Sequence, residues 1–142
     1  MADEWSTDIG VGCKYFSQDA VIKLAPAAGI CLNEGLTPAQ KLVVVQELIE
    51  NGDPSAVKIY ESIGCYLAHT IKLYCHFYDI CHLIVLGRVM SGRGGEIIMD
   101  TCKKILADEY PELAANVNVM LPDERMRRVG QSVAAASLPE CK

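Results

Sequence analysis

The stretch that decides the fold is ICHLIVLGRVMSGRGGE, residues 80–96. Its apolar run, HLIVLG, shows no alternation of polar and apolar residues, which is typical of a strand covered on both faces. Gly87 ends this run, and a Gly/Ser-rich loop then leads into a helical pattern from about Gly94 to Tyr110. The stretch therefore predicts the strand–turn–helix of an α/β domain.

The turn in this stretch leaves two interpretations open. Ligands of open α/β sheets bind outside the carboxyl ends of the strands, and the free N–H groups of a helix N-terminus favour anions. The loop has no GKS or GKT, so it is not a P-loop, and it also departs from GxGxxG. The residues alone therefore favour a nucleotide-binding turn and a plain connection about equally.

The rest of the chain predicts four more helices and a second strand. Ser17 is a helix cap, and Thr37-Pro38 and Asp53-Pro54 each place a cap before proline at the first helical position. The expected helices are 17–28, 37–52, about 54–77 and 123–137, and the second strand is VNVML, 117–121. The long third helix carries Gly64 and Ala68, which allow close packing.

The order α-α-α-β-α-β-α indicates a parallel or mixed sheet with helices on its faces. Two strands make a poor sheet. We therefore expect one domain over residues 1–142 whose sheet needs further strands from an upstream segment, a partner chain or its flanks.

Composition and charge exclude several classes of function. The chain has 142 residues, 51% of them hydrophobic and 22% charged, which is ordinary for one globular domain. A net charge of −5 argues against nucleic-acid or anionic-membrane partners. No apolar run approaches the roughly 20 residues that span a bilayer, and the acidic start, MADEWSTDIG, is unlike a signal peptide. We therefore expect a cytoplasmic protein.

The seven cysteines fit a reducing compartment. Their number is odd, no secretion signal precedes them, and most lie in apolar segments. We therefore expect free thiols that serve as small core residues. They are Cys13, Cys31, Cys65, Cys75, Cys81, Cys102 and Cys141.

Candidate catalytic and metal-binding residues form weak patterns. Two Cys-His pairs begin at Cys75 and Cys81, but neighbouring strand residues point to opposite faces, which disfavours zinc binding by Cys81 and His82. His69 has no nucleophile motif beside it and is expected to be structural. The acids outside the apolar stripes and the basic cluster of the last helix are expected to be solvated. These charged residues are Asp100, Asp108, Glu109, Asp123, Glu124, Arg125, Arg127 and Arg128.

Four segments carry a family resemblance. They are CKYFSQDAVIKLA (13–25), GDPSAVKIYESIGCYLAHTIKLYCHFYD (52–79), HLIVLGRVMSGRGGEIIMDTCKKIL (82–106) and RRVGQSVAAASLP (127–139). In this order they resemble an "E.y.S..al" segment, a "GD..A" helix start, an "ivigGgvs..g..l" strand, loop and helix, and a closing helix with glycine and alanines. The chain from about 10 to 137 is thus similar to the C-terminal half of ROK-family sugar kinases and repressors, in the actin–hexokinase–Hsp70 superfamily.

The resemblance implies a lobe that holds adenosine against the glycine-rich turn, with ATP and magnesium as the cofactor. By match, the nucleotide-binding positions are Gly87, Arg88, Ser91 and Gly92. Arg88 replaces the family's second glycine, and Cys13 replaces its sugar-contacting glutamate. The family's zinc motif is missing before Gly12, so no zinc is expected. The N-terminal lobe, with its catalytic aspartate, is also missing.

We therefore expect a helix-rich α/β fold, the C-terminal lobe of an actin-like ATPase (ribonuclease H-like) with a small, incomplete sheet. The parent activity is ATP-dependent phosphorylation of a sugar hydroxyl, and half of that apparatus is expected to be catalytically silent, with no catalytic residue of its own. One alternative is an interaction module that forms a homodimer through its long helices or binds a separate N-terminal-lobe chain. Two others are a fragment of a BadF-type activator ATPase and a lone nucleotide-binding regulator.

Overall fold

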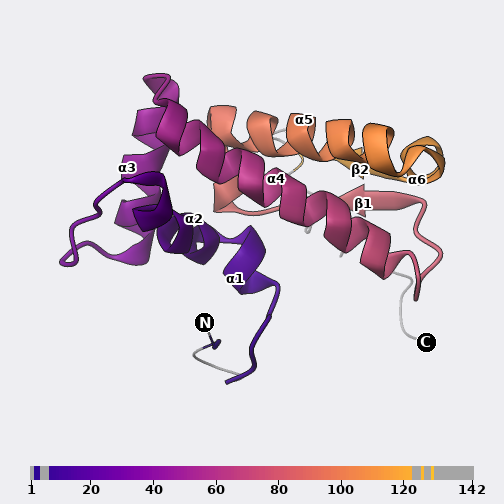
Figure 1. The fold of residues 1–142 in the computed structure, drawn as a ribbon, viewed down its shortest axis with the longest axis horizontal. Coiled ribbons are helices and arrows are strands. Elements are labelled where there is room, and N and C mark those ends of the chain that lie inside the picture. Colours follow the sequence, from indigo (N-terminus) through magenta and orange to yellow (C-terminus); the bar gives the residue numbers. More distant parts are fainter. Residues whose placement is uncertain (1, 4–6, 123–125, 127–128, 130–142) are drawn as a thin grey trace.

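The computed structural model describes residues 2–3, 7–122, 126 and 129 (Figure 1). In chain order the elements are α1 (Cys13–Phe16), α2 (Gln18–Leu24), the 3-10 helix η1 (Pro26–Ala28), α3 (Pro38–Glu50), α4 (Pro54–Tyr74), β1 (His82–Ile84), the 3-10 helix η2 (Arg88–Met90), α5 (Gly92–Glu109), α6 (Pro111–Asn116) and β2 (Asn118–Met120). The helix expected over 123–137 lies outside the described residues, apart from two positions. No helix in the described part is long and apolar enough to cross a membrane.

The helix starts predicted at Ser17, Thr37 and Asp53 are confirmed, because each of these side chains caps its helix. Thr37 accepts a hydrogen bond from the backbone N–H of Gln40, whose side chain bonds back to the Thr37 N–H, forming a capping box before Pro38. Asp53 accepts from the backbone N–H groups of Ser55 and Ala56 at 2.8 and 3.2 Å. These caps fix where the two long helices, α3 and α4, begin.

α4 and α5 run side by side in the same direction and form the main packed interface (Figure 1). A Cβ atom on Gly64 would lie 2.7 Å from the carbonyl oxygen of Ile98 and 2.8 Å from Cβ of Thr101. One turn earlier, the ring of Tyr60 fills the space beside Gly94. The close packing expected of Gly64 is therefore confirmed, and it leaves no room for larger residues at the crossing.

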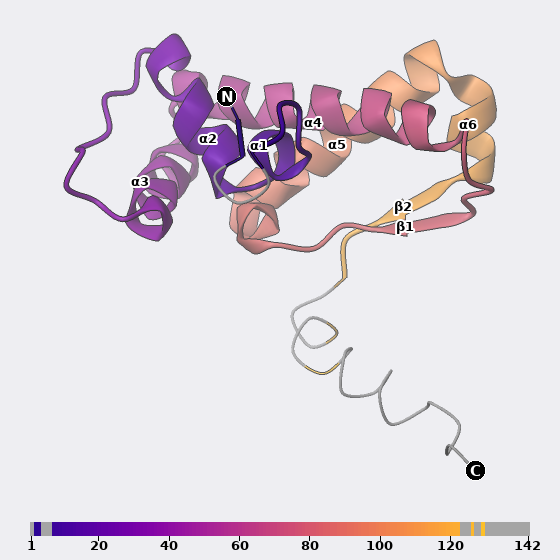
Figure 2. The same cartoon turned by 90° about the horizontal axis from the view of Figure 1, so that it is seen from below.

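β1 and β2 form a two-stranded parallel sheet with Leu83 opposite Val119. Leu83 and Val119 contact the core, whereas His82 and Ile84 are exposed, Ile84 by 58%. Figure 2 shows the helical layer on one side of the strands. The expected strand covered on both faces is therefore wrong for the part of the chain that is described, because the described helices cover one face only.

The core lies between the helical layer and the sheet, and the cysteines contribute less to it than expected. Of the described cysteines, Cys102 is buried, and burial raises the pKa of its thiol to about 11. Cys13, Cys31 and Cys81 are exposed, and the remaining two described cysteines are half-buried. The expectation of core cysteines is wrong for the exposed three, because each lies at an element end or in a loop rather than on a buried face. All six described cysteines are free thiols, as expected.

Two short α-helices, and the 3-10 helix η2, were not predicted. α1 is a single turn before α2, and α6 fills the connection between α5 and β2. The coarse expectation is confirmed: the described chain is helix-rich, with six α-helices and one small two-stranded parallel sheet.

Candidate functional site

The glycines that end the loop at 87–95 serve helix packing. Gly94 and Gly95 are buried in the first turn of α5. A Cβ atom on Gly94 would overlap the ring of Tyr60, and one on Gly95 would overlap the carbonyl group of Met90. Two of the glycines that suggested a phosphate loop are thus needed to bring α5 against α4 and against its own preceding turn.

The middle of the loop is held by α3. The backbone N–H of Arg93 donates to Oε1 of Glu50 at 3.3 Å, and Nε2 of Gln46 donates to the carbonyl oxygen of Arg88 at 3.2 Å. Gly92 has a left-handed φ of 63°, and a Cβ atom on it would lie 3.2 Å from Oε1 of Glu50. The positive N-terminal end of α5 is therefore already next to a carboxylate of the chain itself.

The start of the loop is open. Gly87 has a φ of 135°, which L-residues rarely adopt. Apart from its chain neighbours, no heavy atom of the described residues lies within 4 Å of the position where its Cβ would be. Gly87 and Arg88 line a cleft of about 310 Å³ whose opposite wall is Phe16–Asp19. The turn after β1 thus faces the N-terminus of α2 across a space that backbone or ligand atoms can approach.

The α2 wall of this cleft is fixed by side-chain contacts. Ser17 caps α2 by accepting a hydrogen bond from the Asp19 N–H at 3.1 Å. Lys14, only 3% exposed, forms an ion pair of 2.9 Å with Asp19. Cys13 donates a hydrogen bond to Asp3 at 3.2 Å, and this bond to the carboxylate raises the pKa of the thiol. The wall is therefore preformed around a buried cation.

The structure brings together only part of the predicted nucleotide site. Gly87 and Arg88 lie in the cleft, with the Arg88 side chain exposed. Ser91 is the N-cap residue of α5, and Gly92 lies against Glu50; neither lines the cleft. Sequence reasoning missed the Phe16–Asp19 wall as a partner of Gly87, although that segment was one of the four that carried the family resemblance.

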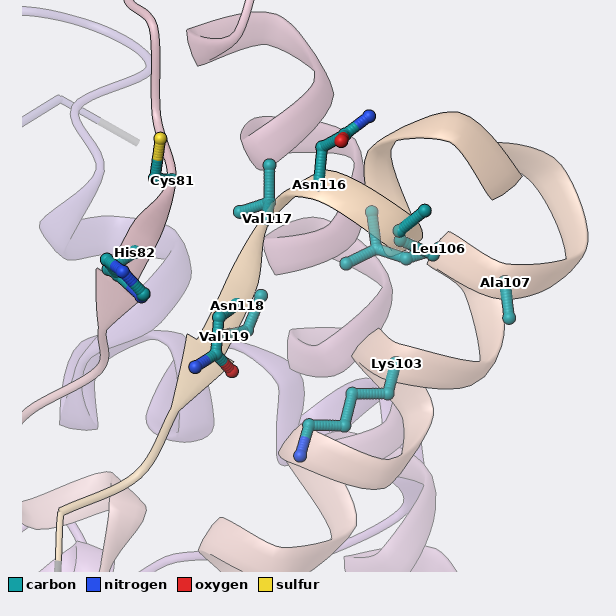
Figure 3. A pocket seen from close by; sticks show the side chains of 11 residues that line it. Cys81, His82, Lys103, Leu106, Ala107, Asn116, Val117, Asn118 and Val119 are labelled. Atoms are coloured by element: carbon teal, nitrogen blue, oxygen red, sulfur yellow. The ribbon is translucent and has the colours of Figure 1, made fainter.

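Two further hollows follow β2. They have volumes of about 700 and 670 Å³ and share Lys103, Asn118 and Val119 in their walls. In the first, Figure 3 shows Lys103 extending from α5 on the side of β2, with His82 on the neighbouring strand β1 and Cys81 just before that strand. Both hollows are lined by residues of β1, β2 and α5, and the first also by α6, with no cluster of three metal-ligating side chains among the described residues.

The described histidines and acids do not form a reactive cluster. Nδ1 of His69 lies 2.9 Å from the hydroxyl of Tyr110, and the two rings meet edge to face. This contact supports the structural role expected for His69. Within the described residues, no group of three or more His, Cys, Asp or Glu side chains is placed to hold a metal ion.

Comparison with protein-family models, curated proteins and solved structures found no match to this chain.

Proposed function

We propose that this chain binds an adenine nucleotide in the cleft between Gly87-Arg88 and Phe16–Asp19, as the nucleotide-side lobe of a ROK-like sugar kinase. One observation carries the proposal. The strand–turn segment and the α1–α2 segment each resemble the family, lie far apart in the sequence, and form the two walls of one cleft. The size of the cleft, about 310 Å³, is at the lower end of small-molecule sites.

The residues of the cleft have separate roles in this proposal. Gly87 lacks a side chain, so a flat base or a ribose can lie directly on the backbone after β1. The exposed guanidinium of Arg88 is suited to bind phosphate oxygens in bidentate fashion. Because Glu50 lies at the N-terminus of α5, the phosphates are held by Arg88 and not by that helix end.

In this proposal, magnesium is bound by the nucleotide phosphates and not by a metal site of the protein. The described residues offer no cluster of three acidic or other ligating side chains. Phosphoryl transfer requires metal, phosphates and nucleophile to be positioned together, with a general base for the sugar hydroxyl. We therefore propose that sugar phosphorylation is the activity of the parent protein and that this chain alone is silent. Sugar-dependent release of ADP by the pure chain would contradict the second part.

Calorimetric titration with ATP, ADP and adenosine tests the binding role. Arg88→Ala is expected to weaken ATP binding about tenfold while leaving adenosine affinity unchanged, since it removes one charged hydrogen-bonding partner of the phosphates. Arg93→Ala is the matched control, because Arg93 is exposed on the same loop but lies outside the cleft. Equal losses in the two variants, or a loss of adenosine affinity in Arg88→Ala, would rule out the assigned role of Arg88.

A second candidate function is a non-catalytic interaction module. The observation that favours it is the side of the small sheet that the described helices leave uncovered, where Ile84 and Leu86 are each 58% exposed. A contiguous exposed apolar patch is the kind of surface that marks a protein interaction site. A monomer by light scattering at high concentration, with no nucleotide affinity, would contradict both candidates.

A further inference from the structure

β2 has an edge that no strand occupies in the described part of the chain. Its other edge pairs with β1, with the backbone N–H of Asn118 donating to Cys81 and the carbonyl of Met120 accepting from Val85. An unpaired strand edge presents N–H and C=O groups that another strand can bind. The two hollows between β2 and α5 lie beside this strand, so the space next to it is not filled by side chains.

The helix beside this strand carries charges in a fixed order. Glu96, Asp100 and Lys103 follow one another at helical spacing, are exposed, and line the hollows. None of the three forms an ion pair within the described residues. Along α5 the two acids precede the lysine. If a second α5 ran antiparallel to the first, Lys103 of each copy would therefore lie opposite an acid of the other copy.

We propose that a second copy of this chain pairs its β2 with this one, antiparallel, about a two-fold axis near Val119. The two small sheets then become one four-stranded sheet. A two-fold interface must be self-complementary, and the reversed order of Asp100 and Lys103 meets that condition. This surface lies on the β2 side, and it differs from the long-helix dimer expected from the sequence.

The shape of the hollows agrees with this pairing. With Val119 at the axis, Val117 lies opposite Leu121 of the second copy. The hollow at the Val117 end has small residues in its wall, Ala107, Ala114 and Ala115, which leave room for a large apolar side chain. Leu121 of the second copy can therefore pack into this hollow, and by symmetry Leu121 of the first copy packs into the same hollow of the second.

The proposal gives the second candidate function a partner and a surface, and it stands or falls independently of nucleotide binding. Light scattering and sedimentation of the full chain test it. The wild type is expected to dimerise. Lys103→Glu is expected to raise the dissociation constant about tenfold, since two symmetric ion pairs become two repulsive pairs. The double change Lys103→Glu with Asp100→Lys restores the pairs and is expected to return the constant to within about threefold of wild type.

Lys104→Glu is the matched control, because Lys104 is an exposed neighbour on α5 that lines neither hollow. It is expected to leave the dimer unchanged. A monomer at all concentrations overturns the proposal. A dimer that ignores Lys103→Glu, or that weakens equally with Lys104→Glu, also overturns it and places the contact on another surface.

Discussion

The two ends of one glycine-rich loop differ in the space around them. At the helix end, Gly94 and Gly95 are buried against Tyr60 and Met90, and a Cβ atom fits at neither position. At the strand end, the described part of the chain places no heavy atom beyond the immediate neighbours within 4 Å of the Gly87 Cβ position, and Gly87 borders a cleft. Glycines that are neighbours in the sequence therefore have different roles: those at the helix end allow helices to pack closely, and the one at the strand end leaves room for a ligand.

The same contrast separates the two sides of the molecule. The α4–α5 side is closed, because glycines let the two helices approach until backbone meets side chain. The sheet side is open in the described part of the chain, since Ile84 is 58% exposed and hollows lie along β2. Figure 2 shows the helices on one side of the two strands. Substitutions on the closed side should therefore change stability, and those on the open side should change binding.

The largest effect is expected for Gly94→Ala. In an exposed helix this change stabilises by about 1 kcal/mol, but here the added methyl overlaps the Tyr60 ring. Overpacking should reverse the sign and destabilise the chain by about 2 to 3 kcal/mol. Urea unfolding measures the change, with Gly87→Ala as the control that meets backbone strain without a clash. An unchanged or raised stability of Gly94→Ala would show that this contact is not closed.

A moderate, stabilising effect is expected for Tyr60→Phe. The Tyr60 hydroxyl is buried and has no hydrogen-bond partner among the residues that the structure describes. Removing an unsatisfied buried hydroxyl without changing the ring should raise the free energy of unfolding by about 1 kcal/mol. A loss of stability in Tyr60→Phe would instead mean that the hydroxyl is hydrogen-bonded in solution.

The stabilities of the wild type and Tyr60→Phe should also depend differently on pH. Burial raises the pKa of Tyr60 above the ordinary tyrosine value of 10.0. As pH rises past this ordinary value, the unfolded chain releases the Tyr60 proton while the folded chain keeps it. The folded state then binds more protons, so wild-type stability falls with pH. Tyr60→Phe lacks this contribution, and the stability gap between the two should widen above about pH 10. Parallel stability curves would contradict the burial of this hydroxyl.

The smallest effect is expected for Glu50→Gln. The Glu50 carboxylate lies at the positive end of α5, and its loss should cost about 0.5 kcal/mol at low ionic strength. The cost should shrink in 1 M salt because the charge is screened. Glu47→Gln, an exposed neighbour on α3, is the control and should change stability less. Equal effects in the two variants would show that the α5 end does not depend on Glu50.

The helices were predictable because their signals are local. Thr37-Pro38 and Asp53-Pro54 specify cap and first turn within a few residues, and the structure confirms both starts. α6 also begins with a proline, Pro111, but Tyr110 before it provides no side-chain cap, so the local signal for this helix is weaker. Which elements cover β1 depends on tertiary structure and not on local sequence. The apolar run of 82–87 therefore led to the wrong expectation that both faces of the strand are covered.

The candidate site was predictable only in part, for the same reason. Gly87 and Arg88 could be singled out because a turn after a strand lies at a sheet edge. Nothing local tells that Gly94 faces Tyr60, that Glu50 reaches the α5 N-terminus, or that Phe16–Asp19 closes the cleft. These contacts join segments that are far apart in the chain, and they decide which glycines can face a ligand.

The measurement that tests the central claim most directly is a calorimetric titration of ADP and ATP, with magnesium, into wild type, Gly87→Trp and Gly29→Trp. Gly29 also has a left-handed φ, 79°, and open space at its Cβ position, so the two variants carry a similar backbone cost. The account predicts binding by wild type and Gly29→Trp, and a loss of at least about tenfold in Gly87→Trp, whose indole fills the cleft. No binding by wild type at millimolar nucleotide, or equal affinities in the two variants, would contradict it and leave the turn after β1 as architecture alone.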